Sequence, residues 1–192
     1  MAPMLRMRER ALAGFAMIEV LITLIIILLG LLGVAALMVR ANTSQMESYQ
    51  RVQAVILLED MRNRIEANRA VATCYANGPT GTQLGTGYGG TPTCVAGTVA
   101  QNAQAIADMA EWNAQLLGSA ESQSGSNVGA MLGARGCVSE IDAANRVYLI
   151  SVAWQGMASS AVPKVICGQG QYGADDSLRR ALSVTVRIGN LS

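Results

Sequence analysis

An uncharged apolar segment, residues 20–39, constrains this chain more than any other feature. A helix of about 20 residues is about 30 Å long, which matches the hydrocarbon core of a bilayer. Most residues of the segment are Leu, Ile or Val, and each of these favours membrane insertion by about 0.3–0.6 kcal/mol. We therefore expect one membrane-spanning helix near the N-terminus.

The residues on either side of this segment predict its orientation. Arg6, Arg8 and Arg10 precede it with a single acid, Glu9, among them, whereas Arg40 is the basic residue directly after it. Basic residues concentrate on the cytoplasmic side of membrane helices. The N-terminus is therefore expected in the cytoplasm, and the rest of the chain outside it.

Two simpler kinds of segment share part of this pattern. A secretory signal peptide has a shorter apolar region that ends in small residues, whereas Ala13 and Gly14 precede the apolar segment here. A plain signal anchor explains the length and the basic flank, but not Glu19. A charge costs about 2.5–3.5 kcal/mol at the centre of a membrane helix, and less near its edge, so such residues are usually functional.

The sequence GFAMIEVLI, residues 14–22, resembles the processing motif of type IV prepilins. The resemblance implies cleavage between Gly14 and Phe15 by the membrane-embedded prepilin peptidase, and N-methylation of Phe15. Glu19 is then the fifth residue of the mature chain. Because cleavage leaves a cationic amino group on Phe15 in a low-dielectric environment, we expect Glu19 of the same or a neighbouring subunit to neutralise it. This pairing would set the axial register between subunits.

The four cysteines all lie beyond the apolar segment, at Cys74, Cys94, Cys137 and Cys167. No C-x-x-C pair occurs and the chain has no His, so we expect no metal site. An even number of cysteines outside the cytoplasm predicts two disulfides. The sequence allows three pairings. Cys74–Cys94 and Cys137–Cys167 are favoured because each closes a loop of about 20–30 residues at modest entropic cost.

The first helix is expected to continue beyond the membrane, because residues 40–71 contain neither Pro nor Gly. Leu58, Met61 and Ile65 recur at helical spacing and predict one stripe that faces a globular domain. The charged residues between them predict a solvated face of the same helix: Glu59, Asp60, Arg62 and Arg64.

The remaining sequence predicts one more helix, two loops and several strands. Residues 101–118 fit an amphipathic helix, with Trp112 in the core and Ile106, Met109 and Leu116 on the same side. Gly- and Thr-rich residues 75–97 and Ser/Gly-rich residues 119–130 predict loops. The segments with strand character are residues 136–141, 146–154, 163–168 and 181–188.

Together these elements predict an α+β fold. A long N-terminal helix, membrane-spanning in its first half, is expected to pack on an antiparallel β-sheet of about four strands. The resemblance to type IV pilins implies the same architecture. The expected divisions are a prepilin leader at 1–14, a membrane-spanning and polymerisation helix at 15–39, its extramembrane continuation at 40–73 and a periplasmic globular domain at 74–192.

The sequence predicts no enzyme. The chain lacks His, each Cys has an expected disulfide role, and adjacent Asp175 and Asp176 predict a solvated turn before Arg179 and Arg180. A formal net charge of +1 gives no reason to expect a nucleic-acid partner. We therefore expect no catalytic site, cofactor, metal or direct binding of nucleic acid.

The segments AEWNAQLLG and YLISVAWQG resemble the PilV branch of minor pilins. The resemblance implies a minor pilin that takes part in priming and assembly of a type IV pilus (fimbrium), and hence in twitching motility, adhesion or DNA uptake. The implied partners are other major and minor pilins, the prepilin peptidase and the inner-membrane assembly platform. The implied location is the inner membrane, as a single-pass precursor, and then the pilus at the cell surface.

Two other functions stay open at the level of sequence. A minor pseudopilin of a type II secretion system shares the whole N-terminal motif. A pilus-tip adhesive module would use the loop at residues 77–93 or the Ser-rich loop near Ser122.

Overall fold

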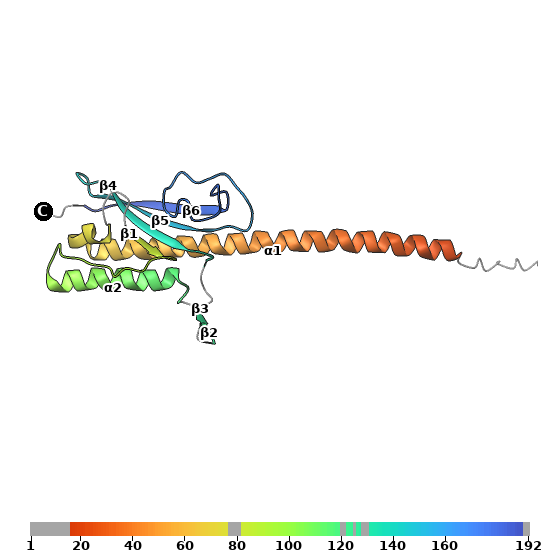
Figure 1. The fold of residues 1–192 in the computed structure, drawn as a ribbon, viewed down its shortest axis with the longest axis horizontal. Coiled ribbons are helices and arrows are strands. Elements are labelled where there is room, and N and C mark those ends of the chain that lie inside the picture. The colour runs from red at the N-terminus through yellow and green to blue at the C-terminus, as the bar shows by residue number, and fades with distance from the viewer. Residues whose placement is uncertain (1–15, 77–81, 120–121, 125, 128–130, 190–192) are drawn as a thin grey trace, which may run out of the picture. The chain divides into compact units, whose positions relative to one another are not determined.

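The computed structural model describes residues 16–76, 82–119, 122–124, 126–127 and 131–189 (Figure 1). The leader predicted at residues 1–14 lies outside these. The chain divides into two compact units, Met1–Ser44 and Gln45–Ser192. The elements in chain order are α1 (Met17–Ala67), the 3-10 helix η1 (Arg69–Tyr75), β1 (Thr82–Gly85), α2 (Val99–Leu116), β2 (Ser122–Gln123), β3 (Ser126–Asn127), β4 (Arg135–Asp142), β5 (Val147–Gln155) and β6 (Arg179–Arg187).

Helix α1 runs through the apolar segment and on to Ala67, so the predicted continuation is observed. Its residues lack Pro throughout, and a helix without Pro keeps its hydrogen-bond ladder. Glu19 lies in the first turn and Arg64 in the last, each at the end of the helix dipole that suits its charge.

The sheet has the strand order β1-β4-β5-β6, and every neighbouring pair is antiparallel. Strands β4 and β5 form a hairpin in which Cys137 lies opposite Ser151. β2 and β3 form a separate two-stranded ladder. The α+β class and the antiparallel sheet of four strands expected from the sequence are therefore confirmed.

The core of the second unit lies where the C-terminal part of α1, helix α2 and the sheet pack together, and Figure 1 shows α1 alongside both. Leu58, Met61 and Ile65 are buried, as their spacing predicts, and so is Trp112 of α2. Side chains of this size each contribute about 1.5–3 kcal/mol when fully buried. The Trp112 indole N–H also donates to the Leu57 carbonyl oxygen at 2.9 Å, which fixes α2 against α1.

Two of the sequence-based expectations for the sheet are wrong. Residues 163–168 form no strand, because their carbonyl oxygens bind an arginine side chain instead of a neighbouring strand. The fourth strand is β1, which lies inside the segment expected to be a loop. Leu84 of β1 is buried, and Gly85 has a φ of 92°, a left-handed conformation that favours glycine and ends the strand.

Candidate functional site

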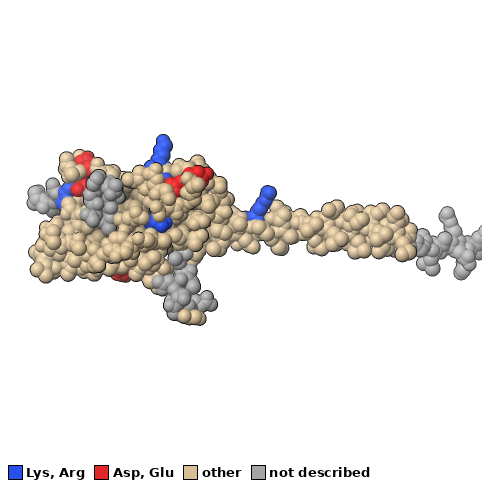
Figure 2. Space-filling model, in the orientation of Figure 1, with Lys and Arg blue, Asp and Glu red and all other residues tan. Residues whose placement is uncertain are grey.

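The first half of α1 is apolar on every side. All its large apolar side chains from Met17 to Val39 are exposed, by 48% to 87%. On the face in Figure 2 the surface of this segment is uncharged. Among the described residues, α1 is the one helix long and apolar enough to cross a membrane. A helix that is hydrophobic all round is buried in a membrane or in a protein core when it functions.

Glu19 is the first charged residue of α1, and the next one along the helix is Arg40. Its backbone N–H donates to the Ala16 carbonyl oxygen at 2.9 Å, so Glu19 is already part of the helix. Its carboxylate forms no ion pair with any residue that the structure describes. Gly14 and Phe15, the predicted cleavage and methylation positions, lie outside the described residues, so those roles stay predictions.

The solvated helix face expected near residue 60 is present only in part. Arg62 donates to Glu59 at 3.2 Å and to Glu66 at 3.0 Å, and all three side chains are at least 40% exposed. The two acceptors raise the pKa of the Arg62 guanidinium, with the Glu66 hydrogen bond the larger cause. Exposed pairs of this kind contribute little to stability.

Arg64 departs from that expectation, because its side chain is only 16% exposed. It donates to Asp60 at 2.8 Å on its own helix, and to Asp108 at 3.1 Å and Glu111 at 2.9 Å on α2. Burial alone would lower the pKa of Arg64, but the hydrogen bonds with Glu111 and Asp60 raise it overall. Arg64 therefore stays charged and joins α1 to α2.

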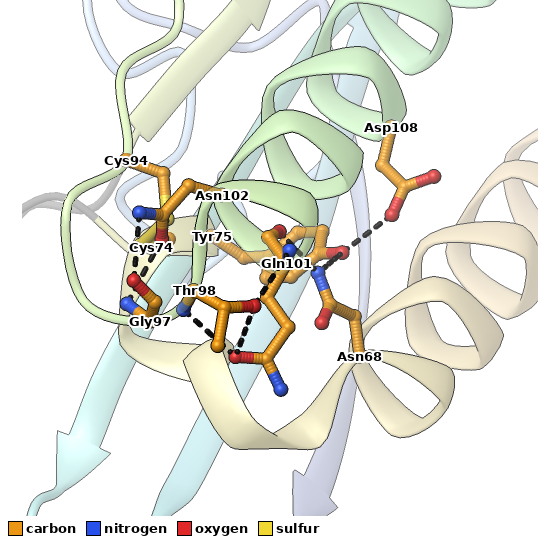
Figure 3. The surroundings of a disulfide bond; sticks show 9 residues. All are labelled: Asn68, Cys74, Tyr75, Cys94, Gly97, Thr98, Gln101, Asn102 and Asp108. Carbon is orange, nitrogen blue, oxygen red and sulfur yellow. Dashed lines mark hydrogen bonds between the residues drawn. A yellow bond between two sulfur atoms is a disulfide. The ribbon is translucent and has the colours of Figure 1, made fainter.

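Asp108 is a buried carboxylate that the sequence did not single out. It accepts a hydrogen bond from the Tyr75 hydroxyl at 2.5 Å (Figure 3). It also accepts one from Gln104 at 2.8 Å. Burial first, and the Asp108 hydrogen bond second, raise the pKa of Tyr75. Asn68 donates to the Tyr75 hydroxyl at 3.3 Å. The network connects the end of α1 with η1 and α2.

The cysteines form the two disulfides that the sequence favoured on the ground of loop length. Cys74 and Cys94 are joined at 2.03 Å across a separation of 20 residues, and Cys137 and Cys167 at 2.07 Å across 30. The first bond lies beside the N-terminus of α2 (Figure 3). There the Asn102 side chain accepts from Gly97 N at 2.9 Å and donates to its carbonyl oxygen at 3.0 Å.

Thr98 begins α2 with a capping box. Its hydroxyl oxygen accepts from Gln101 N, and the Gln101 side chain accepts from Thr98 N (Figure 3). The first disulfide therefore closes its loop directly onto a capped helix end.

The solvated turn expected at Asp175 and Asp176 is wrong for Asp176. Its carboxylate is buried, lies 3.2 Å from buried Arg179, and accepts from Gly170 N at 2.7 Å and Tyr172 N at 3.4 Å. The Gly170 hydrogen bond first, and Arg179 as well, hold the pKa of Asp176 below its usual value against the effect of burial. Asp175 is exposed, as expected.

Side chains suited to metal binding do not converge in the described part of the chain. No group of three or more His, Cys, Asp or Glu residues could hold a metal ion there. An apolar pocket of about 300 Å³ lies between α1 and α2, beside Ile56, Leu57 and Leu116. A more polar one of about 290 Å³ lies beside Tyr88 and the first disulfide. The exposed apolar half of α1, with Glu19 in its first turn, is therefore the candidate functional site.

Comparisons with known proteins found no relative of this chain. No protein-family model, curated protein or solved structure matches the chain. The class that the structure defines is a long N-terminal apolar helix that carries an antiparallel sheet on its second part. That arrangement is compatible with a pilin-like fold.

Proposed function

We propose that the chain is a minor pilin of a type IV pilus, similar to the PilV branch, which is made as a prepilin. One observation carries the proposal: the first half of α1 is apolar and exposed on every side, has a single carboxylate, Glu19, in its first turn, and continues into a disulfide-bonded domain. The GF-x-x-x-E motif at residues 14–19 supports the same function.

In the proposed mechanism the first half of α1 exchanges lipid for other helices. Lipid tails and apolar helices bury this surface almost equally, so packing and polar pairing decide the association. After cleavage, the amino group of Phe15 in one subunit would lie against Glu19 of the same or a neighbouring subunit. At a separation of about 4 Å and an effective dielectric of about 20, such a pair attracts by about 4 kcal/mol. A shifted register would lose this pairing.

The proposed function involves several partners and two locations. The prepilin peptidase removes residues 1–14 in the inner membrane, and the assembly platform then inserts the subunit among major and minor pilins. The second unit stays in the periplasm until the subunit reaches the filament. Its disulfides suit that oxidising compartment. The chain itself supplies no catalysis, and its role is to help prime or promote assembly.

A clean deletion, scored in parallel for surface pili and for exoprotein secretion, tests this function. We expect sparse or absent pili with normal secretion, and restoration by the wild-type chain. Normal pili with blocked secretion would instead identify a minor pseudopilin of a type II secretion system. Normal pili with normal secretion would contradict both functions.

A further inference from the structure

The loop between β5 and β6, residues 156–178, carries apolar side chains on its outside. Met157 is 53% exposed, Val162 50% and Ile166 57%. Single exposed apolar residues are common on proteins, but three on one connecting loop are worth explaining. The inner side of the same loop covers the sheet, where Tyr172 and Cys167 are buried against Ala153.

The backbone of this loop is held in place by Arg179, at the start of β6. The guanidinium donates to the carbonyl oxygens of Pro163 at 3.0 Å and Cys167 at 3.1 Å, and to that of Val165. These three carbonyls hold every second residue of the stretch against Arg179, and Lys164 and Ile166 between them are exposed. The loop is therefore fixed in a conformation that presents Ile166 to solvent.

A second contact fastens the loop to α1 at Glu47. The Glu47 carboxylate accepts from Met157 N at 3.2 Å and from Arg180 at 3.1 Å. Arg180 in turn donates to the Ala158 carbonyl oxygen at 2.6 Å. Glu47 lies at the beginning of the second unit, two residues after Gln45. The apolar loop is thus tied to the part of α1 that first enters this unit.

The chain length places Glu47 close to the bilayer. Val39, the last residue of the uncharged segment, precedes Glu47 by eight residues. Both residues belong to helix α1, so the eight residues span about 12 Å. The headgroup region adds about 5–7 Å on each side of the hydrocarbon core. A loop held at Glu47 is therefore within reach of the membrane surface.

The charge that lies among the exposed apolar side chains of the loop suits a lipid surface. Glu47 is paired with Arg180 and Asp176 with Arg179, and Lys164, between Val162 and Ile166, forms no ion pair with any described residue. The exposed acid of the loop, Asp175, lies nine residues beyond Ile166 and accepts from Ser177 N at 3.1 Å. Lys164 is the chain's one lysine. Apolar side chains beside a basic one bind the interface of anionic membranes, and each basic residue near the surface adds attraction.

We propose that the loop at residues 156–178 rests on the bilayer and holds the second unit at the surface of an anionic membrane before assembly. Met157, Val162 and Ile166 enter the interfacial layer, and Lys164 contacts anionic headgroups. This inference rests on the membrane insertion of α1 in the proposed function, but not on pilus assembly.

Tryptophan fluorescence in reconstituted vesicles tests this contact. The full chain carrying Ile166→Trp is inserted into vesicles of phosphatidylethanolamine and phosphatidylglycerol with brominated acyl chains, which quench nearby indoles. Both native tryptophans, Trp112 and Trp154, are buried, so the brominated chains reach them poorly and their emission gives a background that is quenched little. We expect at least twofold stronger quenching of Ile166→Trp than of wild type, and a weaker effect when Lys164→Gln is added.

Ile141→Trp is the matched control. Ile141 is also exposed, at 53%, but it lies near the β4–β5 turn at the opposite end of the sheet. At that turn Arg146 donates to the Arg69 carbonyl oxygen at 2.6 Å. Arg69 lies just beyond the end of α1 at Ala67, and Ala67 follows Glu47 by 20 residues, which is about 30 Å of helix. We expect no additional quenching in this variant.

The possible outcomes separate this inference from the proposed function. Equal quenching of the two variants, in a chain that resists carbonate extraction, would overturn the loop contact alone. Quenching that disappears on diluting the protein in lipid would indicate contact between copies and would also overturn it. A chain that carbonate extracts from the vesicles would contradict membrane insertion, and the two proposals would fail together.

Discussion

At the scale of single residues, Glu19 is the position on which the proposed assembly depends. It sits in the first turn of α1, where the helix dipole already favours a carboxylate. Thr23, the next polar residue of the segment, donates to the Val20 carbonyl oxygen at 2.8 Å and so is satisfied within its own helix. Glu19 is the side chain of this segment that needs a partner from elsewhere.

We expect Glu19→Gln and Glu19→Ala to be cleaved normally but to enter filaments poorly. Either change leaves the Phe15 amino group without its counter-charge, and breaking a buried ion pair costs about 3–5 kcal/mol. Incorporation should then fall by about a hundredfold or more. The measurement is the amount of this subunit in sheared pili relative to the membrane pool. Thr23→Val, the matched control, should be incorporated normally, and wild-type incorporation of Glu19→Gln would refute the role.

The Tyr75 hydroxyl makes a second residue-scale prediction. We expect Tyr75→Phe to lower the free energy of unfolding by about 1.5–3 kcal/mol, because the buried Asp108 carboxylate loses a hydrogen bond. Urea unfolding of the full chain in detergent micelles measures this. Tyr148→Phe is the control, since Tyr148 donates at 3.0 Å to a half-buried acceptor, Glu140, and should cost less. Equal losses in the free energy of unfolding for the two variants would contradict a larger contribution from the Tyr75–Asp108 hydrogen bond.

The pH dependence of the Tyr75→Phe effect follows from the same contact. The folded pKa of Tyr75 lies above its unfolded value of 10.0, through burial and then the Asp108 hydrogen bond. The resulting stability is therefore complete below pH 10 and is lost as the pH rises toward the folded pKa. The stability difference between wild type and Tyr75→Phe should shrink above pH 10. A difference that stays constant from pH 8 to 11 would be inconsistent with this linkage.

At the scale of elements, the sequence predicted the helices better than the strands. The spacing of Leu58, Met61 and Ile65 marks one helix face, because that pattern depends on neighbours three and four residues apart. β1 has only four residues in a Gly- and Thr-rich segment, and it is a strand because β4 pairs with it. No local pattern contains that information.

Residues 163–168 show the opposite error. Their apolar and β-branched residues are typical of a strand, but Arg179 takes their carbonyl oxygens and the disulfide takes Cys167. The polar residues of this contact were misjudged for the same reason. Asp176 and Arg64 looked solvated beside their sequence neighbours, and their burial depends on partners that only the folded chain brings together.

The packing of α2 on the sheet is tested at Gly136. A Cβ at this position of β4 would lie 2.3 Å from the Trp112 ring and 2.7 Å from a Leu116 methyl carbon. We expect Gly136→Ala to destabilise the fold by about 1–3 kcal/mol through overpacking. Urea unfolding in micelles checks the value. Gly189→Ala, where nothing lies within 4 Å, is the control and should change stability little. A neutral Gly136→Ala would show that α2 can move away from β4.

The two disulfides are expected to differ in their resistance to reduction. Cys137 and Cys167 are buried, whereas Cys74 and Cys94 are half-buried beside the polar pocket. Exchange requires a thiolate to reach a sulfur atom, so Cys74–Cys94 should be reduced first in the native protein. Alkylation followed by peptide mass spectrometry measures the order. In denaturant the two bonds should react alike, and a Cys137–Cys167 bond that is reduced first would contradict the expectation.

At the scale of the whole molecule, the chain combines two units with opposite solvent requirements. Met1–Ser44 contains the apolar segment, and Gln45–Ser192 contains a hydrophobic core and both disulfide bonds. A permanent membrane anchor would keep the apolar segment in lipid and the disulfide-bonded unit in water. A prepilin must instead be able to leave the membrane, and the proposed processing at Gly14 and Phe15 distinguishes a prepilin from a permanent anchor.

The mass of the mature chain decides between a processed prepilin and a permanent signal anchor. We expect intact-mass spectrometry of the membrane-bound protein to show loss of residues 1–14 and the addition of one methyl group, with fragmentation placing the methyl on the Phe15 amino group. Gly14→Leu is the control variant, because a bulky side chain at the predicted cleavage position should leave the leader in place. If the wild-type chain keeps its leader in cells with an active prepilin peptidase, the protein is a plain signal-anchored protein. In that case Glu19 has no new amino group to pair with, and the register argument fails as well.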